Sequence, residues 1–70
     1  MAVSYKKLWI LLIEKNMKKT DLRIQSGIST GALAKLGKNE NVNTKVFAKI
    51  CKALNCKIED IMEMVPAEEV

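Results

Sequence analysis

The stretch SGISTGALAKLGKNENVN, residues 26–43, decides the fold of this 70-residue chain. It opens at the end of one helical pattern, KKTDLRIQS (residues 18–26), and a second pattern follows after Gly27. Gly27 can adopt the left-handed backbone that ends a helix, and Ser29 is a favourable N-cap residue for the next one. The sequence therefore predicts two short helices joined by a glycine-containing turn.

The second of these helices is expected to run from Ser29 to about Leu36, where Gly37 would close it in the left-handed conformation. At about 100° per residue, its apolar side chains share one side. The opposite side carries Thr30, Gly31, Ala34, Lys35 and Lys38. This outward side has no acidic or bulky side chain, so it can approach a negatively charged rod closely.

Apolar periodicity predicts three further helices. The first runs from about Tyr5 to Lys15 behind Ser4 as N-cap, another covers residues 44–54 behind Asn43, and the last covers residues 58–65. No segment alternates with period two for long enough to predict a strand. We therefore expect an all-α fold of five short helices, forming one domain over residues 1–65, with residues 66–70 as a disordered acidic tail.

The expected core draws on apolar positions of four of the expected helices and of the turn before the third helix. These positions are Leu8, Leu11, Leu12, Leu22, Ile28, Val46, Phe47, Ile50, Cys51, Leu54, Ile58, Ile61, Met62 and Val65, with Ile24 partly covered. The first helix has a second apolar flank of Tyr5, Trp9 and Ile13. This flank is wider than one core contact needs, so either the C-terminal helix or a second subunit is expected to cover it.

Charge is distributed unevenly along the chain. Residues 1–57 hold all twelve Lys and Arg residues and three acidic ones, a net +9, whereas residues 58–70 carry five acidic residues. This asymmetry favours a polyanionic partner on one side of the molecule. The alternative is that the lysines only solvate helix surfaces.

Several classes of function are disfavoured. The chain has no histidine, and Cys51 and Cys56 are too few for structural zinc, so no metal or other cofactor is expected. No Ser or Cys has a base at a suitable spacing, and GISTG is not a phosphate-binding loop, so we do not expect an enzyme. The longest apolar run, Leu8–Ile13, is too short to cross a bilayer, and no signal peptide is visible, which favours a cytoplasmic protein without membrane contact.

LRIQSGISTGALAKL resembles the helix-turn-helix of the lambda-repressor-like DNA-binding domains, also called the Cro/cI-type or XRE family. The matching positions are Leu22, Gly27, Ile28, Ser29, Leu33 and Leu36. NVNTKVFAKICKALNCKIEDIMEM is similar to the last two helices of the family. The resemblance implies a small bacterial or phage-type transcriptional regulator that binds double-stranded DNA, with a recognition helix at about residues 30–36 in the major groove. A homodimer is expected because one helix this short gives little affinity alone.

The resemblance also implies which residues contact DNA. Base contacts carry over to Thr30, Gly31, Ala34 and Lys35, and phosphate contacts carry over to Lys19, Lys38, Asn39, Asn41, Asn43 and Lys45. The chain departs from the family where Arg23 replaces a frequent small Ala, and where Thr30 and Gly31 replace the usual Gln, Arg or Asn. Because Thr30 and Gly31 cannot form bidentate pairs with bases, these departures predict weak base discrimination.

A second class of function fits the same sequence. An antitoxin-like or phage accessory protein would use the acidic end and the wide apolar first helix to bind a partner chain, with weak or no DNA binding. Retention of random duplex at low salt separates the two interpretations.

The homodimer of the first interpretation would use apolar residues that the core does not cover. The candidate contact residues are Trp9, Ile10, Ile13 and the segment 62–65.

Overall fold

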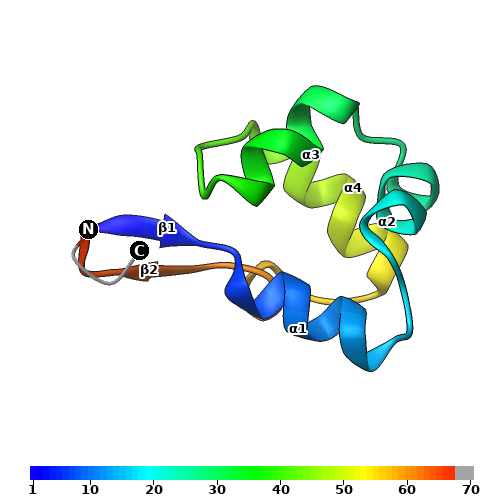
Figure 1. Cartoon of the computed structure of the whole chain (residues 1–70), viewed down its shortest axis with the longest axis horizontal. Helices are drawn as coiled ribbons and strands as arrows, with labels where there is room; N and C mark the ends of the chain where they lie inside the picture. Colours follow the sequence, from blue (N-terminus) through cyan, green and yellow to red (C-terminus); the bar gives the residue numbers. More distant parts are fainter. Residues whose placement is uncertain (68–70) are drawn as a thin grey trace.

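The computed structural model describes residues 1–67, in which four α-helices form a compact body and two short strands form a ribbon beside it (Figure 1). The elements are β1 (Ala2–Ser4), α1 (Lys6–Glu14), α2 (Lys19–Ser26), α3 (Thr30–Gly37), α4 (Thr44–Leu54), the 3₁₀ turn η1 (Ile58–Asp60) and β2 (Glu63–Val65). The ribbon lies at one end of the longest dimension, which is 32 Å. The first four expected helices are confirmed, whereas the expectation of a fifth helix and of no strand is wrong.

The segment expected as the fifth helix, residues 58–65, divides into a turn and a strand. Its apolar spacing suits a helix, but only Ile61 is fully buried, and Ile58 is 48% exposed. The chain leaves η1 and β2 pairs antiparallel with β1, so that Val3 lies opposite Met64. Ser4, expected as the N-cap of the first helix, is instead the last residue of β1, and Tyr5 occupies the cap position.

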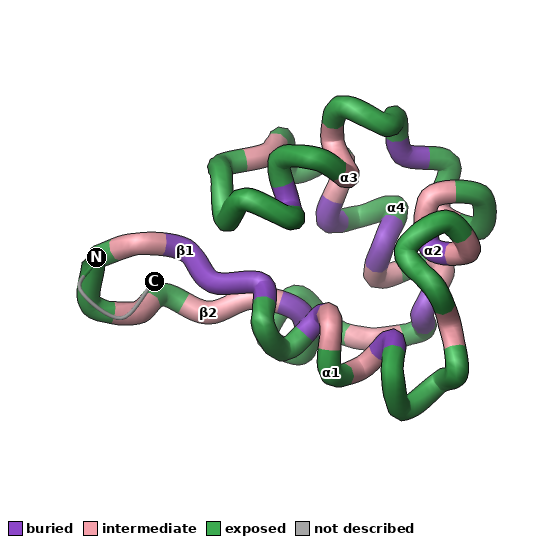
Figure 2. Tube along the Cα trace, viewed as in Figure 1, coloured by how far each residue is buried: buried purple, intermediate pink, exposed green. Residues whose placement is uncertain are grey.

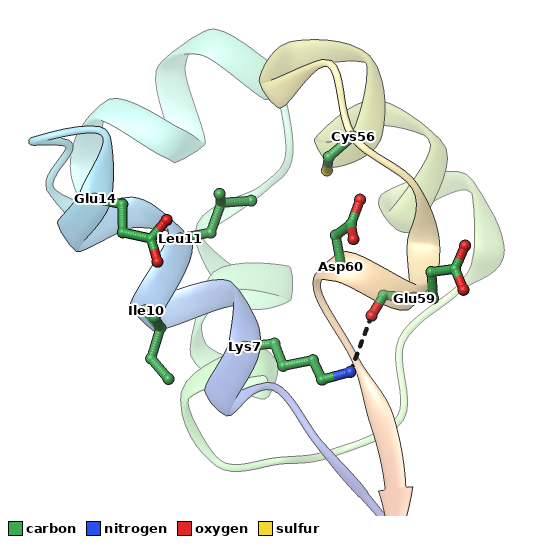
Figure 3. A pocket seen from close by; sticks show the side chains of 7 residues that line it. All are labelled: Lys7, Ile10, Leu11, Glu14, Cys56, Glu59 and Asp60. Atoms are coloured by element: carbon green, nitrogen blue, oxygen red, sulfur yellow. Dashed lines mark hydrogen bonds between the residues drawn. The ribbon is translucent and has the colours of Figure 1, made fainter.

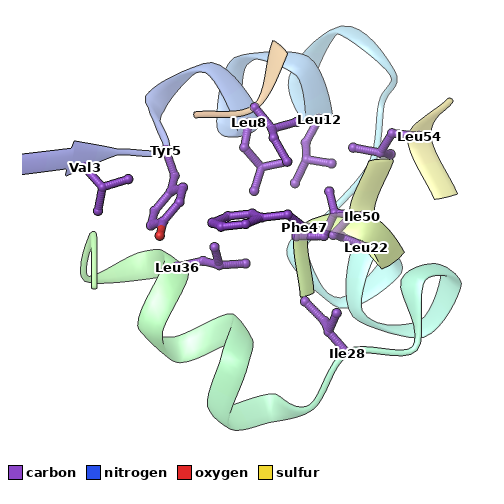
Figure 4. Close-up of a cluster of buried hydrophobic side chains, with 11 residues drawn as sticks. Val3, Tyr5, Leu8, Leu12, Leu22, Ile28, Leu36, Phe47, Ile50 and Leu54 are labelled. Atoms are coloured by element: carbon purple, nitrogen blue, oxygen red, sulfur yellow. The ribbon is translucent and has the colours of Figure 1, made fainter. Parts of the chain in front are cut away.

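A single apolar core joins β1 and the four α-helices (Figures 2 and 4). Its buried members are Val3, Tyr5, Leu8, Leu12, Leu22, Ile28, Leu36, Phe47, Ile50, Leu54 and Ile61. The side chains of α4 stand at the centre, and Phe47 lies between Tyr5 and the leucines of the neighbouring helices (Figure 4). Most of the expected core is confirmed, but Ile24 was expected to be partly covered and is 64% exposed.

The turn between α2 and α3 is built as the sequence predicts. The backbone N–H of Lys18 donates to Asp21 Oδ2 at 2.9 Å at the start of α2, and Gly27 ends that helix with φ 76°. Ser29 Oγ then accepts the N–H of Ala32 at 3.1 Å, which satisfies one of the free donors at the start of α3. These caps fix the angle at which α3 leaves α2.

The other end of α3 differs from the expectation. Gly37 is the last residue of α3 rather than a left-handed terminator, and the left-handed residue is Asn39, with φ 55°. Asparagine tolerates this conformation better than most residues because its side chain can form local hydrogen bonds. The turn into the following loop therefore depends on Asn39.

The second apolar flank of α1 is only partly covered. Tyr5 is buried, Trp9 is half-buried with the ammonium of Lys19 4.5 Å from its ring centre, and Ile13 is 74% exposed. The C-terminal element that contacts α1 is the 3₁₀ turn η1 and not the expected α-helix. One part of this flank, around Ile13, thus stays open to solvent.

Cys51 and Cys56 are free, half-buried thiols at the end of α4. The N–H of Cys56 donates to the carbonyl of Cys51 at 3.0 Å around the left-handed Asn55, the bond pattern of a Schellman helix end. Burial, followed by the neighbouring Cys51 thiol, raises the pKa of Cys56 to about 11. Both cysteines pack against the core and serve as apolar packing groups.

Two further expectations concern the membrane and the end of the chain. Within residues 1–67, no helix has the length and apolar character that a membrane crossing requires. The expected acidic tail, residues 66–70, lies mostly outside the described residues, which end with the exposed Pro66 and Ala67.

Candidate nucleic-acid interface

The outward side of α3 is open to solvent along its whole length. Leu36, on the opposite side, is completely buried and points towards Tyr5 and Phe47 in the core (Figure 4). The residues on the outward side, which we call the outer face of α3, are Thr30, Gly31, Ala34, Lys35 and Lys38, and all five are exposed. The structure thus brings together all four residues expected at bases and one expected at phosphate.

Gly31 is the one position on the outer face where the residue type works against the helix. A glycine inside a helix costs about 1 kcal/mol relative to alanine. Its φ is not positive, and a Cβ built there would meet only Ser29 Oγ, at an ordinary contact distance of 3.8 Å. The fold itself therefore has no need for glycine at this position.

A shallow hollow of about 250 Å³ runs beside Gly31, between α3 and the start of α4. It is lined by Ser29, Gly31, Ala32, Lys35, Val42, Asn43 and Val46. Asn43 Oδ1 accepts the N–H of Lys45 at 2.7 Å and so caps α4. Asn43 and Lys45 therefore lie at the positive end of a helix dipole, next to the outer face of α3.

The loop after α3 holds the other residues expected at phosphates. Asn39 and Asn41 are exposed and, with Lys35, border a second hollow of about 590 Å³ that reaches the β1–β2 ribbon. Asn39 Oδ1 already accepts the backbone N–H of Tyr5 at 3.1 Å, so this oxygen has a structural role. Lys19 is separate from this group, at the start of α2 above Trp9.

The lysines of this region form no salt bridge with any of the described residues. Within residues 1–67 the only salt bridge joins Lys7 and Glu63 at 3.7 Å, at the foot of the ribbon. Lys35, Lys38 and Lys45 are thus available to an external anion. No group of three potential metal-ligating side chains occurs in the same part of the chain.

A groove between α1 and η1 has the opposite character (Figure 3). It encloses about 330 Å³ and is lined by Lys7, Ile10, Leu11, Glu14, Cys56, Glu59 and Asp60. The carboxylates of Glu14 and Asp60 lie beside its apolar floor, and Lys7 Nζ donates to the backbone carbonyl of Glu59 at 3.3 Å. This acidic groove repels a polyanion, so the candidate interface is confined to the side that carries α3.

Two residues of the region escaped the sequence interpretation. Tyr5 was expected on an apolar flank, yet its hydroxyl donates to the carbonyl of Glu40 at 2.7 Å and holds the loop after α3. Val42 was not singled out, although it forms a wall of the hollow beside Gly31. Neither role has a local sequence signal, because Tyr5 is 35 residues from its partner and Val42 lies in a polar loop.

Comparison with known proteins agrees with this geometry. A family model described as the Cro/C1-type helix-turn-helix DNA-binding domain matches residues 7–67, and the chain belongs to this family. Membership in a family of DNA-binding domains agrees with the expectation that the chain is not an enzyme. A search of curated proteins gave no match.

One solved structure is very similar to this one. It is a crystal structure of the transcriptional regulator VanUg, with a TM-score of 0.90 and 54% sequence identity. The match covers 93% of this chain and 87% of that chain. The overall arrangement of this chain thus belongs to a fold already seen in a transcriptional regulator.

Proposed function

We propose that this protein is a small transcriptional regulator that binds duplex DNA with α3 in the major groove. The observation that carries the proposal is the outer face of α3, whose five residues are all exposed, include no acidic side chain and include two lysines without a salt bridge among the described residues. The family is one of DNA-binding domains, and a protein of 54% identity is described as a transcriptional regulator. A protein acting on chromosomal DNA would work in the cytoplasm.

Within this proposal, Thr30, Gly31, Ala34 and Lys35 face the bases. Lys38, Asn41, Asn43 and Lys45 lie to the side of α3 and hold phosphates, and Lys19 does so from the start of α2. Oδ1 of Asn39 accepts the backbone N–H of Tyr5, and the side-chain NH₂ group of Asn39 is free to donate to a phosphate. Phosphate contacts supply most of the affinity, and the outer face of α3 supplies the sequence preference.

We further propose that the regulator acts as a two-fold dimer, since one helix of eight residues offers little affinity alone. Two recognition helices that read one duplex must face the same way, about 34 Å apart. α1 and α3 lie on opposite sides of the body (Figure 1), so contact through Ile13 would turn the two α3 helices away from each other. Contact through the ribbon, where Met64 is 54% exposed, leaves both free to face one duplex.

A selection experiment tests the function directly. The purified protein is incubated with a random pool of duplexes at low and moderate salt, and the retained duplexes are sequenced. We expect enrichment of a two-fold symmetric site, and loss of retention for Lys35→Glu but not for Lys52→Glu, a matched charge reversal in the last turn of α4. Retention of no duplex would contradict the proposal and favour a protein-interaction module that uses the acidic groove.

A further inference from the structure

The first turn of α3 presents methyl groups and, at Gly31, a backbone without a side chain. A helix that reads DNA sequence commonly presents amide or guanidinium groups there. Thr30 offers one methyl and one hydroxyl group, Gly31 has no side chain, and Ala34 offers a methyl. Thr30 and Gly31 are neighbours of Ala34 on the helix surface, at spacings of four and three residues. The three positions thus form one small apolar patch.

The major groove contains one apolar group that such a patch can recognise, the 5-methyl group of thymine. We propose that the first turn of α3 selects thymine through this methyl group, which seats over Gly31 between the methyl groups of Thr30 and Ala34. The inference deepens the proposed function and rests on it, because α3 must first enter the major groove. It makes Gly31 the residue that determines base preference.

Gly31 supports this assignment because packing inside the protein does not require a glycine at this position. An added Cβ would meet only Ser29 Oγ, at 3.8 Å, so the vacant space opens entirely to the outside. The hollow of about 250 Å³ alongside Gly31 is lined in part by the apolar side chains of Val42 and Val46. A base edge can therefore approach the backbone at Gly31, with the apolar side chains of Val42 and Val46 nearby.

Removal of single methyl groups from the DNA tests the inference. In the duplex obtained by selection, each thymine of a half-site is replaced in turn by deoxyuridine, which pairs identically and lacks only the 5-methyl group. At one or two positions we expect affinity to fall about fourfold, the ratio equivalent to about 0.8 kcal/mol for one buried methyl. Affinities that stay within about twofold at every position would overturn the inference, and this is the result expected if a phosphate lies at Gly31. A selected motif without thymine would also overturn it.

A protein variant then locates the effect. Gly31→Ala places a methyl group in the vacant space, so affinity for the thymine site should fall several-fold, and the preference for thymine over deoxyuridine should approach one. Gly37→Ala is the matched control, because Gly37 is also helical, also has open space around its Cβ position and lies at the other end of α3. It should keep the full preference.

The variants also separate the two levels of the proposal. Alanine favours a helix more than glycine does, so neither variant endangers folding. If Gly31→Ala keeps the thymine preference of the unaltered protein, Gly31 does not seat the methyl group and the inference is wrong, while the proposed function stands. If the unaltered protein binds no duplex at all, the proposed function fails first.

Discussion

The backbone N–H of Tyr5 donates a hydrogen bond to Oδ1 of Asn39 at 3.1 Å, across 34 residues of sequence. The same tyrosine donates its hydroxyl to the carbonyl of Glu40 at 2.7 Å. These two bonds tie the start of α1 to the loop that follows α3. Because that loop borders the candidate DNA interface, the position of the residues that we propose to face phosphates depends on Tyr5.

Asn39 combines a left-handed backbone with this hydrogen bond, and two substitutions separate these roles. Asn39→Gly loses the bond but adopts φ 55° without penalty, and should destabilise the protein by about 1 kcal/mol. Asn39→Ala adds backbone strain and should cost about 2 to 3 kcal/mol. Urea unfolding measures both. Equal losses for the two variants would show that the backbone conformation contributes nothing.

The hydroxyl of Tyr5 should ionise at a higher pH in the folded protein than in the unfolded chain. Burial raises its pKa above the ordinary value of 10.0. Because the folded-state pKa exceeds the unfolded one, the contribution of Tyr5 to the free energy of unfolding is complete below pH 10 and is lost as pH rises through the folded-state pKa. Tyr5 is the single tyrosine, so absorbance at 295 nm follows it alone. A midpoint at or below pH 10 in the folded protein would refute this prediction.

The lysines beside α3 should determine the salt dependence of binding. Each phosphate neutralised by a cation adds nearly one unit to the slope of log affinity against log salt. Lys38→Ala should therefore lower that slope by about one in fluorescence anisotropy titrations, whereas Lys52→Ala, in the last turn of α4, should leave it unchanged. An unaltered slope for Lys38→Ala would remove this lysine from the phosphate contacts.

Two exposed apolar residues report on the proposed dimer. Met64→Lys places a charge on the ribbon and should shift sedimentation at micromolar concentration towards the 7.9 kDa monomer. Ile13→Lys makes the same change on α1, at a residue that is 74% exposed, and should leave the assembly intact. The opposite pattern would move the dimer contact to α1. A monomer for the unaltered protein that still binds a symmetric site would rule out a preformed dimer.

The sequence was sufficient for the features governed by local chemistry. The left-handed Gly27, the capping Ser29 and the buried Leu22 follow from residue type and spacing alone, and all are as predicted. The same signals defined which side of α3 faces solvent. Periodicity and cap residues are local properties, so they remain visible without knowledge of the fold.

Features that depend on distant partners were not predictable in this way. Residues 63–65 form a strand because Ala2–Ser4 lies beside them, and strands of three residues are too short to show alternation. The spacing of Ile58 and Ile61 matched a helix equally well. Gly37 was expected to end α3 in the left-handed conformation. The left-handed residue is Asn39 instead, and its side chain accepts a hydrogen bond from the backbone N–H of Tyr5, 34 residues away.

The most direct test of the central claim is an NMR titration of the ¹⁵N-labelled protein with the selected duplex. Backbone amide shifts report which surface meets DNA, residue by residue, in a chain of this size. We predict that the largest changes occur at Thr30, Gly31, Ala34 and Lys35, with smaller ones at the start of α4. Changes concentrated along the acidic groove of Ile10, Glu14 and Glu59, with α3 unaffected, would contradict the account.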